Sequence, residues 1–200
     1  EATYRALKAL RDSEAWADLS ATQKRMVEKE ELGMKLSGIG LEGADKERFN
    51  MIQMELAELA TGFSNSVLDS RKAYELIITE PSDVEGFPET LRQMTAASAQ
   101  SHGHDDATPE AGPWRITLDA PVAGPFLMHC QNRVLREQVY RAMISVASMG
   151  DLDNGPRIEK ILKLRKEKAQ LLGYASHAEI SLATKMAPSV GAVGKLTAEL

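Results

Sequence analysis

The stretch from Asn132 to Met186, NRVLREQVYRAMISVASMGDLDNGPRIEKILKLRKEKAQLLGYASHAEISLATKM, decides the fold class of this chain. Apolar residues recur in it at the spacing of an amphipathic helix, and Gly150-Asp151 and Gly173-Tyr174 separate three such segments. Glycine just past a helix readily takes the left-handed backbone conformation that ends it. The stretch therefore predicts consecutive helices, and the whole chain is expected to be mainly α.

The residues upstream continue the helical pattern. Ser20 followed by Gln23 is a capping-box pair, so a helix is predicted to begin there, to end before Gly38 and to pack antiparallel on a helix formed by the first residues. The longest helix is predicted over about 45–71, where apolar residues form one stripe at spacings of three and four: Phe49, Ile52, Leu56, Leu59, Phe63 and Val67. A spine for neighbouring helices is favoured over half of a coiled coil, because the heptad pattern is short.

Residues 74–119 interrupt the helical pattern. β-branched and aromatic residues predict strands over about 74–79 and 114–119, which are expected to pair as a small two-stranded element. A helix that begins with Pro88 and runs to about Gln100 is predicted between them, followed by a flexible loop, 101–113. These features divide the chain into an N-terminal helical segment, 1–73, a strand–helix–strand insertion, 74–121, and a second helical segment, 125–200.

Within the second helical segment, one helix is predicted after Pro125 and is ended by Gly150. Its inward residues are expected to be Phe126, Cys130, Val134, Tyr140, Ile144 and Ala147. The following helix, capped near Asn154 or Gly155, is predicted to bury Ile158, Ile161, Leu162, Ala169 and Leu172. Ser176 with Glu179 predicts one more helix through Met186.

Composition excludes several classes of function. The 200 residues are 43% hydrophobic but contain no run of 18 apolar residues, so a membrane-spanning helix is not expected. The net charge is −5 and basic residues are interspersed with acidic ones, which makes nucleic acid an unexpected partner. Cys130 is the single cysteine and cannot form an internal disulfide, which favours a reducing compartment.

Three groups of residues were weighed as candidate sites. His102, His104, Asp105 and Asp106 are metal-ligand types, but a flexible loop supplies neither a rigid scaffold nor a second shell, so no metal site is expected. Cys130 follows His129, yet adjacent helical residues point in different directions, so a buried structural thiol is favoured over a nucleophile. For Arg133, Arg136, Glu137 and Arg141, ion pairing such as Arg133 with Glu137 is favoured over an anion clamp.

Known catalytic motifs are missing from the sequence. The histidines at 102, 104, 129 and 177 do not form H-E-x-x-H, and neither G-x-S-x-G nor a glycine-rich phosphate loop occurs. The residues by themselves therefore assign no catalytic residue, no metal ligand and no substrate-binding residue. They indicate a mainly helical domain and leave its enzymatic status open.

Several short motifs nevertheless occur in a distinctive order. They are the run Leu59 to Asp69, GFPE (Gly86 to Glu89), W-x-ITL with its proline turn (Trp114 to Pro121), NR-x-LRE-x-x-YRA (Asn132 to Ala142), IL-x-LR-x-x-x-A-x-LLGY (Ile161 to Tyr174) and KMA (Lys185 to Ala187). From about Glu47 onward, the chain resembles the N-terminal helical portion of the thimet oligopeptidase family of zinc metallopeptidases. Its loop 101–113 is most similar to plant organellar and cytosolic, oligopeptidase A-like members. Val122-Ala-Gly124 departs from the family, which usually carries a bulkier residue there.

The resemblance implies a two-lobed, mainly helical zinc metalloendopeptidase that hydrolyses short peptides, of which this chain is the scaffold and channel wall. Zinc would belong to the intact enzyme and would lie in the remaining C-terminal catalytic lobe, so this chain alone is expected to carry no cofactor and to be inactive. The family implies an intracellular location, in the cytosol, the chloroplast or the mitochondrial matrix. Both chain ends fall inside helical patterns and are interpreted as cut points. The alternative is a standalone, non-catalytic helical interaction module derived from such a peptidase.

Overall fold

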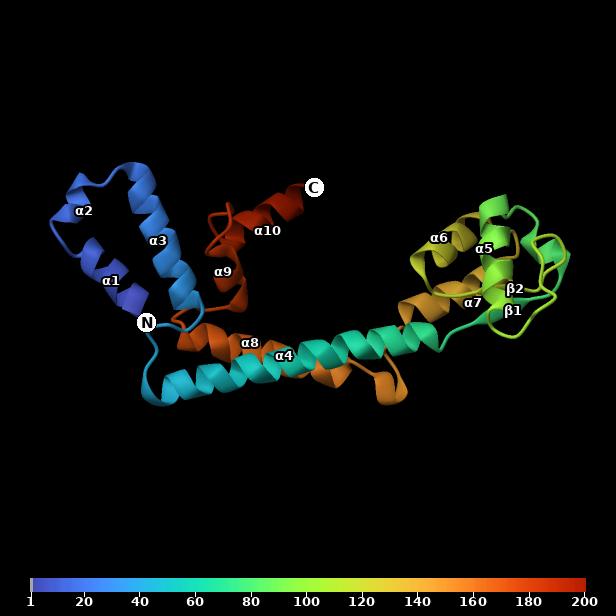
Figure 1. The fold of residues 1–200 in the computed structure, drawn as a ribbon, viewed down its shortest axis with the longest axis horizontal. Coiled ribbons are helices and arrows are strands. Elements are labelled where there is room, and N and C mark those ends of the chain that lie inside the picture. The colour runs from blue at the N-terminus through green and yellow to red at the C-terminus, as the bar shows by residue number, and fades with distance from the viewer. Residues whose placement is uncertain (1) are drawn as a thin grey trace. The chain divides into compact units, whose positions relative to one another are not determined.

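The computed structural model describes residues 2–200, which are mainly helical, as predicted (Figure 1). Contacts divide them into two compact units: unit 1 comprises the residues up to Leu59 together with Ile158–Leu200, and unit 2 comprises Ala60–Arg157. The three segments expected from the sequence stay a prediction. Among residues 2–200, no helix has both the length and the apolar character needed to cross a bilayer.

Unit 1 begins with α1 (Ala2–Arg11), α2 (Ala15–Asp18) and α3 (Ala21–Leu36). Ser20 and Gln23 form the predicted capping box at the start of α3. The chain reverses direction between α1 and α3, which pack together as the predicted antiparallel pair (Figure 1). An ion pair joins them, with Arg11 Nη1 2.8 Å from Glu31 Oε2.

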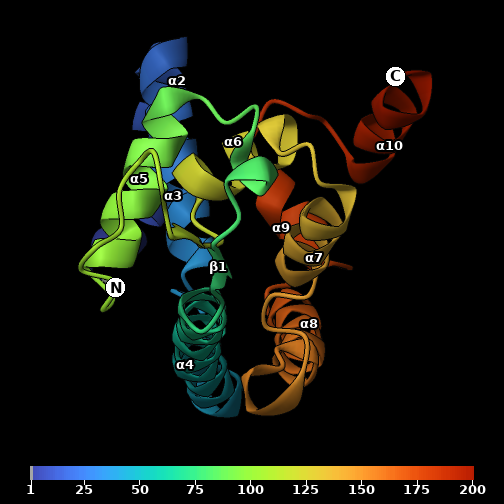
Figure 2. The same cartoon turned by 90° about the vertical axis from the view of Figure 1, so that its right-hand side faces the viewer.

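The longest helix is α4 (Gly43–Lys72), close to its predicted bounds. Its unit 1 part lies beside α8 (Gly155–Leu171) (Figure 2). Arg48 Nη2 donates to Glu167 Oε2 at 2.6 Å, and Lys168 Nζ lies 5.3 Å from the centre of the buried Phe49 ring. These contacts agree with the role of a spine. Unit 1 ends with α9 (His177–Leu182) and α10 (Val190–Glu199).

Unit 2 contains the predicted pair of strands, shorter than expected. β1 (Leu76–Ile78) and β2 (Trp114–Ile116) are antiparallel, with Leu76 opposite Ile116 and Ile78 opposite Trp114. Around them lie the short 3-10 helix η1 (Pro81–Val84) and helices α5 (Glu89–Gln100), α6 (Ala120–His129) and α7 (Arg133–Ile144). Pro88 is the N-cap of α5 rather than its first residue. The core shared by these elements includes Leu91, Trp114, Ile116, Phe126 and Val139.

The prediction of a single helix after Pro125 is wrong. α6 already begins at Ala120 and ends at His129, and Cys130 takes an extended backbone conformation. The Asn132 side chain then caps α7 by accepting hydrogen bonds from the backbone N–H groups of Val134 and Leu135. Because the break resets the helical phase, three residues expected to face inward are exposed, namely Val134, Tyr140 and Ile144.

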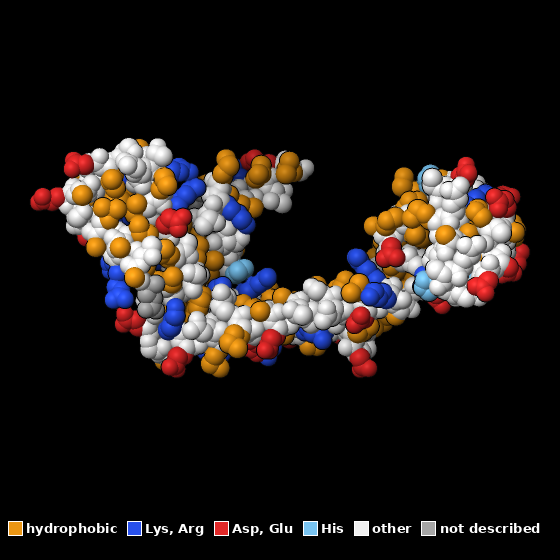
Figure 3. Space-filling model, viewed as in Figure 1, with side chains coloured by type: hydrophobic (Ala, Val, Ile, Leu, Met, Phe, Trp, Pro, Cys, Tyr) orange, Lys and Arg blue, Asp and Glu red, His pale blue; other side chains and the backbone are white. Residues whose placement is uncertain are grey.

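The prediction for the next helix is correct only in part. The 3-10 turn η2 (Gly150–Leu152) precedes α8, which begins at Gly155 with Pro156 in its first turn, as predicted. Ala169 is buried, but Ile158 and Leu162 are 46% and 59% exposed, so their predicted burial is wrong. Gly173 ends the helical run with φ 79°, whereas α9 ends at Leu182 instead of reaching Met186. Figure 3 shows apolar side chains at the surface of both units.

Candidate functional site

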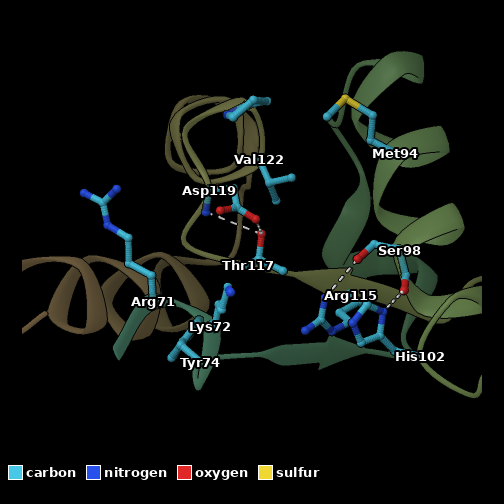
Figure 4. Close-up of a pocket in the computed structure, with 11 residues that line it drawn as sticks. Arg71, Lys72, Tyr74, Met94, Ser98, His102, Arg115, Thr117, Asp119 and Val122 are labelled. Atoms are coloured by element: carbon cyan, nitrogen blue, oxygen red, sulfur yellow. Dashed lines mark hydrogen bonds between the residues drawn. The ribbon is translucent and has the colours of Figure 1, made fainter. Parts of the chain in front are cut away.

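Unit 2 contains a pocket of about 850 Å³ between the end of α4, α5, β2 and the start of α6 (Figure 4). This volume lies in the range of small-molecule sites. Its basic side chains outnumber its single acid, so it is called the basic pocket here. It is lined by Arg71, Lys72, Tyr74, Met94, Ser98, His102, Arg115, Thr117, Asp119, Pro121 and Val122.

Strand alternation brings Arg115 to this pocket. Trp114 and Ile116 on either side of it belong to the core, so Arg115 points to the opposite face of β2. Its Nε donates to Glu75 Oε2 at 2.8 Å, and its Nη1 donates to Ser98 Oγ at 3.1 Å. The hydrogen bond from Arg115 is the main reason that the pKa of the Glu75 carboxyl is lowered. Arg115 is therefore a fixed, largely neutralised cation in the pocket wall.

Two further polar groups are oriented by short contacts. Thr117 Oγ1 donates to Asp119 Oδ2 at 2.9 Å, which holds this carboxylate beside the start of α6. His102 Nδ1 lies 2.9 Å from the carbonyl oxygen of Ser98. A carbonyl only accepts, so Nδ1 carries the hydrogen in this contact.

The remaining charges of the basic pocket come from Arg71 and Lys72, the last two residues of α4. Cations at a helix C-terminus are favoured by the helix dipole. Within residues 2–200, neither side chain forms an ion pair. Next to them, the Tyr74 hydroxyl is buried and has no hydrogen-bond partner, and this burial raises its pKa. The pocket thus offers two cations that form no ion pair among residues 2–200.

The residues weighed as metal ligands do not come together. Across the described residues 2–200, no group of three or more His, Cys, Asp or Glu side chains is arranged to hold a metal ion. His102 instead turns towards α5 and lines the basic pocket. The described residues therefore do not fit a zinc ion, which takes four ligands in structural sites and three in catalytic ones.

Cys130 lies at the break between α6 and α7 and is 3% exposed. Its Sγ is 3.6 Å from the carbonyl oxygen of Asn132 and 3.8 Å from that of Asp83. Burial is the main reason that the pKa of this thiol is raised. A thiol with a raised pKa is a poor nucleophile at neutral pH, which supports the structural interpretation.

The arginine cluster on α7 is organised differently from the prediction. Glu137 pairs with Arg141, with Oε1 2.8 Å from Nε, and not with Arg133. Arg136 Nη1 donates to the carbonyl oxygens of Cys130 and Gln131, at 2.6 and 3.0 Å. The break before α7 leaves these carbonyls without helical partners, so Arg136 is used to satisfy them.

Sequence comparison identifies the family. A model described as "Neurolysin/Thimet oligopeptidase, N-terminal domain" matches residues 1–46, and one described as "Peptidase family M3" matches residues 126–200. The chain belongs to the thimet oligopeptidase family of peptidases, family M3. In the sequence of this M3 family chain, the residues that line the basic pocket fall between the two matched ranges.

Three relatives show how much of a family member is present. The chain is 50% identical over 184 residues to the probable cytosolic oligopeptidase A of Arabidopsis thaliana, covering 92% of the chain and 26% of that protein. It is also 50% identical over 184 residues to the organellar oligopeptidase A, chloroplastic/mitochondrial, of the same plant, covering 92% and 23%. Oligopeptidase A of Escherichia coli is 38% identical over 192 residues, with 94% and 27% covered. The M3 family chain therefore spans about a quarter of these relatives.

The pocket residues were largely missed by sequence reasoning. Of its titratable side chains, the sequence analysis singled out only His102, and for a different role. The alternation in WRITLD was the one available signal, because it places Arg115 on the face of β2 opposite the core. Arg71 and Lys72 carried no signal beyond that of a basic helix end.

Proposed function

We propose that this chain is the N-terminal scaffold and channel-wall part of a zinc metallo-oligopeptidase that hydrolyses short peptides. The observation that carries the proposal is the pair of family matches at both ends of the chain. The three relatives that are 38% to 50% identical to the chain are named oligopeptidases, and the chain corresponds to about a quarter of each. The remaining catalytic lobe is the proposed partner, and short peptides are the proposed substrates.

The proposal assigns the zinc ion to the remaining lobe. H-E-x-x-H is not present in the 200 residues, and residues 2–200 provide no cluster that fits the ion. The chain alone is accordingly proposed to be inactive. Its contribution would be structural: the buried core of unit 2 and the ion-paired helices of unit 1 would each supply a rigid part of the channel wall.

We also propose an intracellular location, in the cytosol, the chloroplast or the mitochondrial matrix. The support is the naming of the two Arabidopsis relatives, one as probable cytosolic and the other as chloroplastic/mitochondrial. Microscopy of the full-length protein fused to a fluorescent tag tests this directly, and secretion of the fusion would contradict it.

The test of function compares the 200-residue chain with the full-length gene product. A quenched fluorescent peptide and a zinc assay are applied to both, with a heat-denatured sample as the blank. We expect turnover and about one zinc ion per chain only for the longer protein. Stoichiometric zinc and turnover by the 200-residue chain would refute the proposal that the zinc ion and the activity belong to the remaining lobe. A transcript whose reading frame ends near Leu200 would favour the standalone module instead.

A further inference from the structure

We propose that the basic pocket is an auxiliary binding site for the carboxylate of a short acidic peptide. The inference rests on the proposed function for the choice of a peptide as ligand. The site itself is argued from side chains that lie within unit 2.

The charges of the basic pocket favour an anion. Arg115 is neutralised by its ion pair with Glu75, which lies outside the lining, and Asp119 is the one acid among the lining residues. Arg71 and Lys72 add two positive charges that form no ion pair with any of the described residues, 2–200, which leaves the site with a net positive charge. A carboxylate placed between them would gain charge-assisted hydrogen bonds.

The neutral groups of the basic pocket suit a peptide better than a bare ion. Met94 and Val122 give it an apolar wall, and Ser98 and Thr117 add hydroxyls that are hydrogen-bonded to Arg115 and Asp119 (Figure 4). A pocket with an apolar lining and a few convergent polar groups is typical of organic ligands. A peptide supplies apolar side chains, amide groups and a carboxylate together, and so matches all three kinds of surface.

The cations of the basic pocket have different surroundings from those of an ordinary helix end. The helix dipole explains why Arg71 and Lys72 follow one another at the end of α4. It does not explain why Ser98, Arg115 and Thr117, from other elements, line the same pocket.

The test is fluorescence anisotropy with a rhodamine-labelled Ala-Glu-Ala-Glu peptide that has a free C-terminus. The comparison peptide is Ala-Gln-Ala-Gln with an amidated C-terminus, so only the carboxylates differ. We expect the acidic peptide to bind the 200-residue chain more tightly, and its binding to weaken at high ionic strength because exposed charges are screened. Equal binding of both peptides, or no binding of the acidic one, would overturn the proposal.

Two sets of variants locate the binding. The double variant R71Q/K72Q should weaken binding of the acidic peptide roughly five- to thirty-fold, which is the effect of losing two partly exposed ion pairs. The pair R5Q and K8Q removes the same charge from exposed positions on α1 and should leave binding within about two-fold. Equal losses in the two pairs would show a general charge effect and overturn the site.

Since none of these measurements needs hydrolysis, binding without turnover by the full-length protein would reject only the proposed function, and turnover without binding would reject only this site.

Discussion

Asn154 Nδ2 donates a hydrogen bond to the carbonyl oxygen of Phe63, 3.1 Å away, although 91 residues separate them in the sequence. Asn154 is 3% exposed, its Oδ1 accepts from Arg157 Nη1 at 2.9 Å, and its backbone N–H donates to the carbonyl oxygen of Ala147. One side chain thus joins α4 to the segment that enters α8, within unit 2.

Asn154→Ala should lower the free energy of unfolding by about 1–3 kcal/mol, because it leaves buried polar partners without a hydrogen bond. Asn65→Ala is the matched control, since Asn65 is an exposed residue of α4, and it should change stability by less than about 0.5 kcal/mol. Urea unfolding followed by circular dichroism measures both. Similar stability of the two variants would contradict the anchoring role of Asn154.

Gly38→Ala should destabilise unit 1. Gly38 has φ 81°, and a Cβ atom there would lie 2.5 Å from Cε1 of the buried Phe49 ring. We expect a loss of roughly 1–3 kcal/mol from backbone strain alone. Gly33→Ala is the opposite case: Gly33 lies inside α3 with nothing within 4 Å of the new Cβ, and the change should stabilise by about 0.5–1 kcal/mol. Thermal unfolding of both variants should therefore shift in opposite directions.

Arg11→Gln should lower the melting temperature at neutral pH and have less effect in acid. The Glu31 side chain is 5% exposed, and its pKa is lowered from 4.5, mainly because Arg11 donates a hydrogen bond to it. A carboxyl with a lowered folded-state pKa contributes stability above its unfolded pKa and loses it as the pH falls through the folded value.

The difference between Arg11→Gln and the unsubstituted chain should therefore shrink as the pH falls below about 4.5. Arg5→Gln, an exposed substitution on the same helix, should show little difference at any pH. Melting curves at a series of pH values test this, and a gap between Arg11→Gln and the parent that persists in strong acid would argue against the Glu31 pair.

Cys130 should react slowly with Ellman's reagent in the folded chain and fully after unfolding. Its thiol is buried, and burial is the main cause that raises its pKa above 9.0, so little thiolate is available at neutral pH. Cys130→Ala should abolish the signal, since this is the single cysteine. Rapid modification of the native chain at neutral pH would show instead that the thiol is activated.

Helix limits were predictable wherever a local signal was strong enough. Ser20 with Gln23, Gly173, and Ser176 with Glu179 each mark the helix boundary that their chemistry predicts. The break before α7 was not predicted, although Asn132 is a good capping residue, because the apolar spacing continues across it. The break depends on distant partners: Asn132 Nδ2 donates to Asp83 Oδ1 at 2.8 Å, a contact that periodicity cannot reveal.

The basic pocket was less predictable than the helices. Arg71, Arg115 and Asp119 come from three elements and meet only after the two strands pair. Local propensity carries no information on such a meeting, whereas membership of the peptidase family could be inferred from motif order. The sequence therefore indicated the class of protein before it could indicate any binding residue.

The two tryptophans of the chain fall one in each unit. Trp114 lies in β2, is fully buried and donates from Nε1 to the carbonyl oxygen of Pro109, whereas Trp16 lies in α2 at a partly exposed position with Lys24 Nζ 6.0 Å from its ring. Their emission spectra should differ accordingly, with the blue-shifted component from Trp114. The chain thus carries one fluorescent reporter in each unit. Trp16→Phe would leave the emission of unit 2, and Trp114→Phe would leave that of unit 1, so the unfolding of each unit can be followed separately.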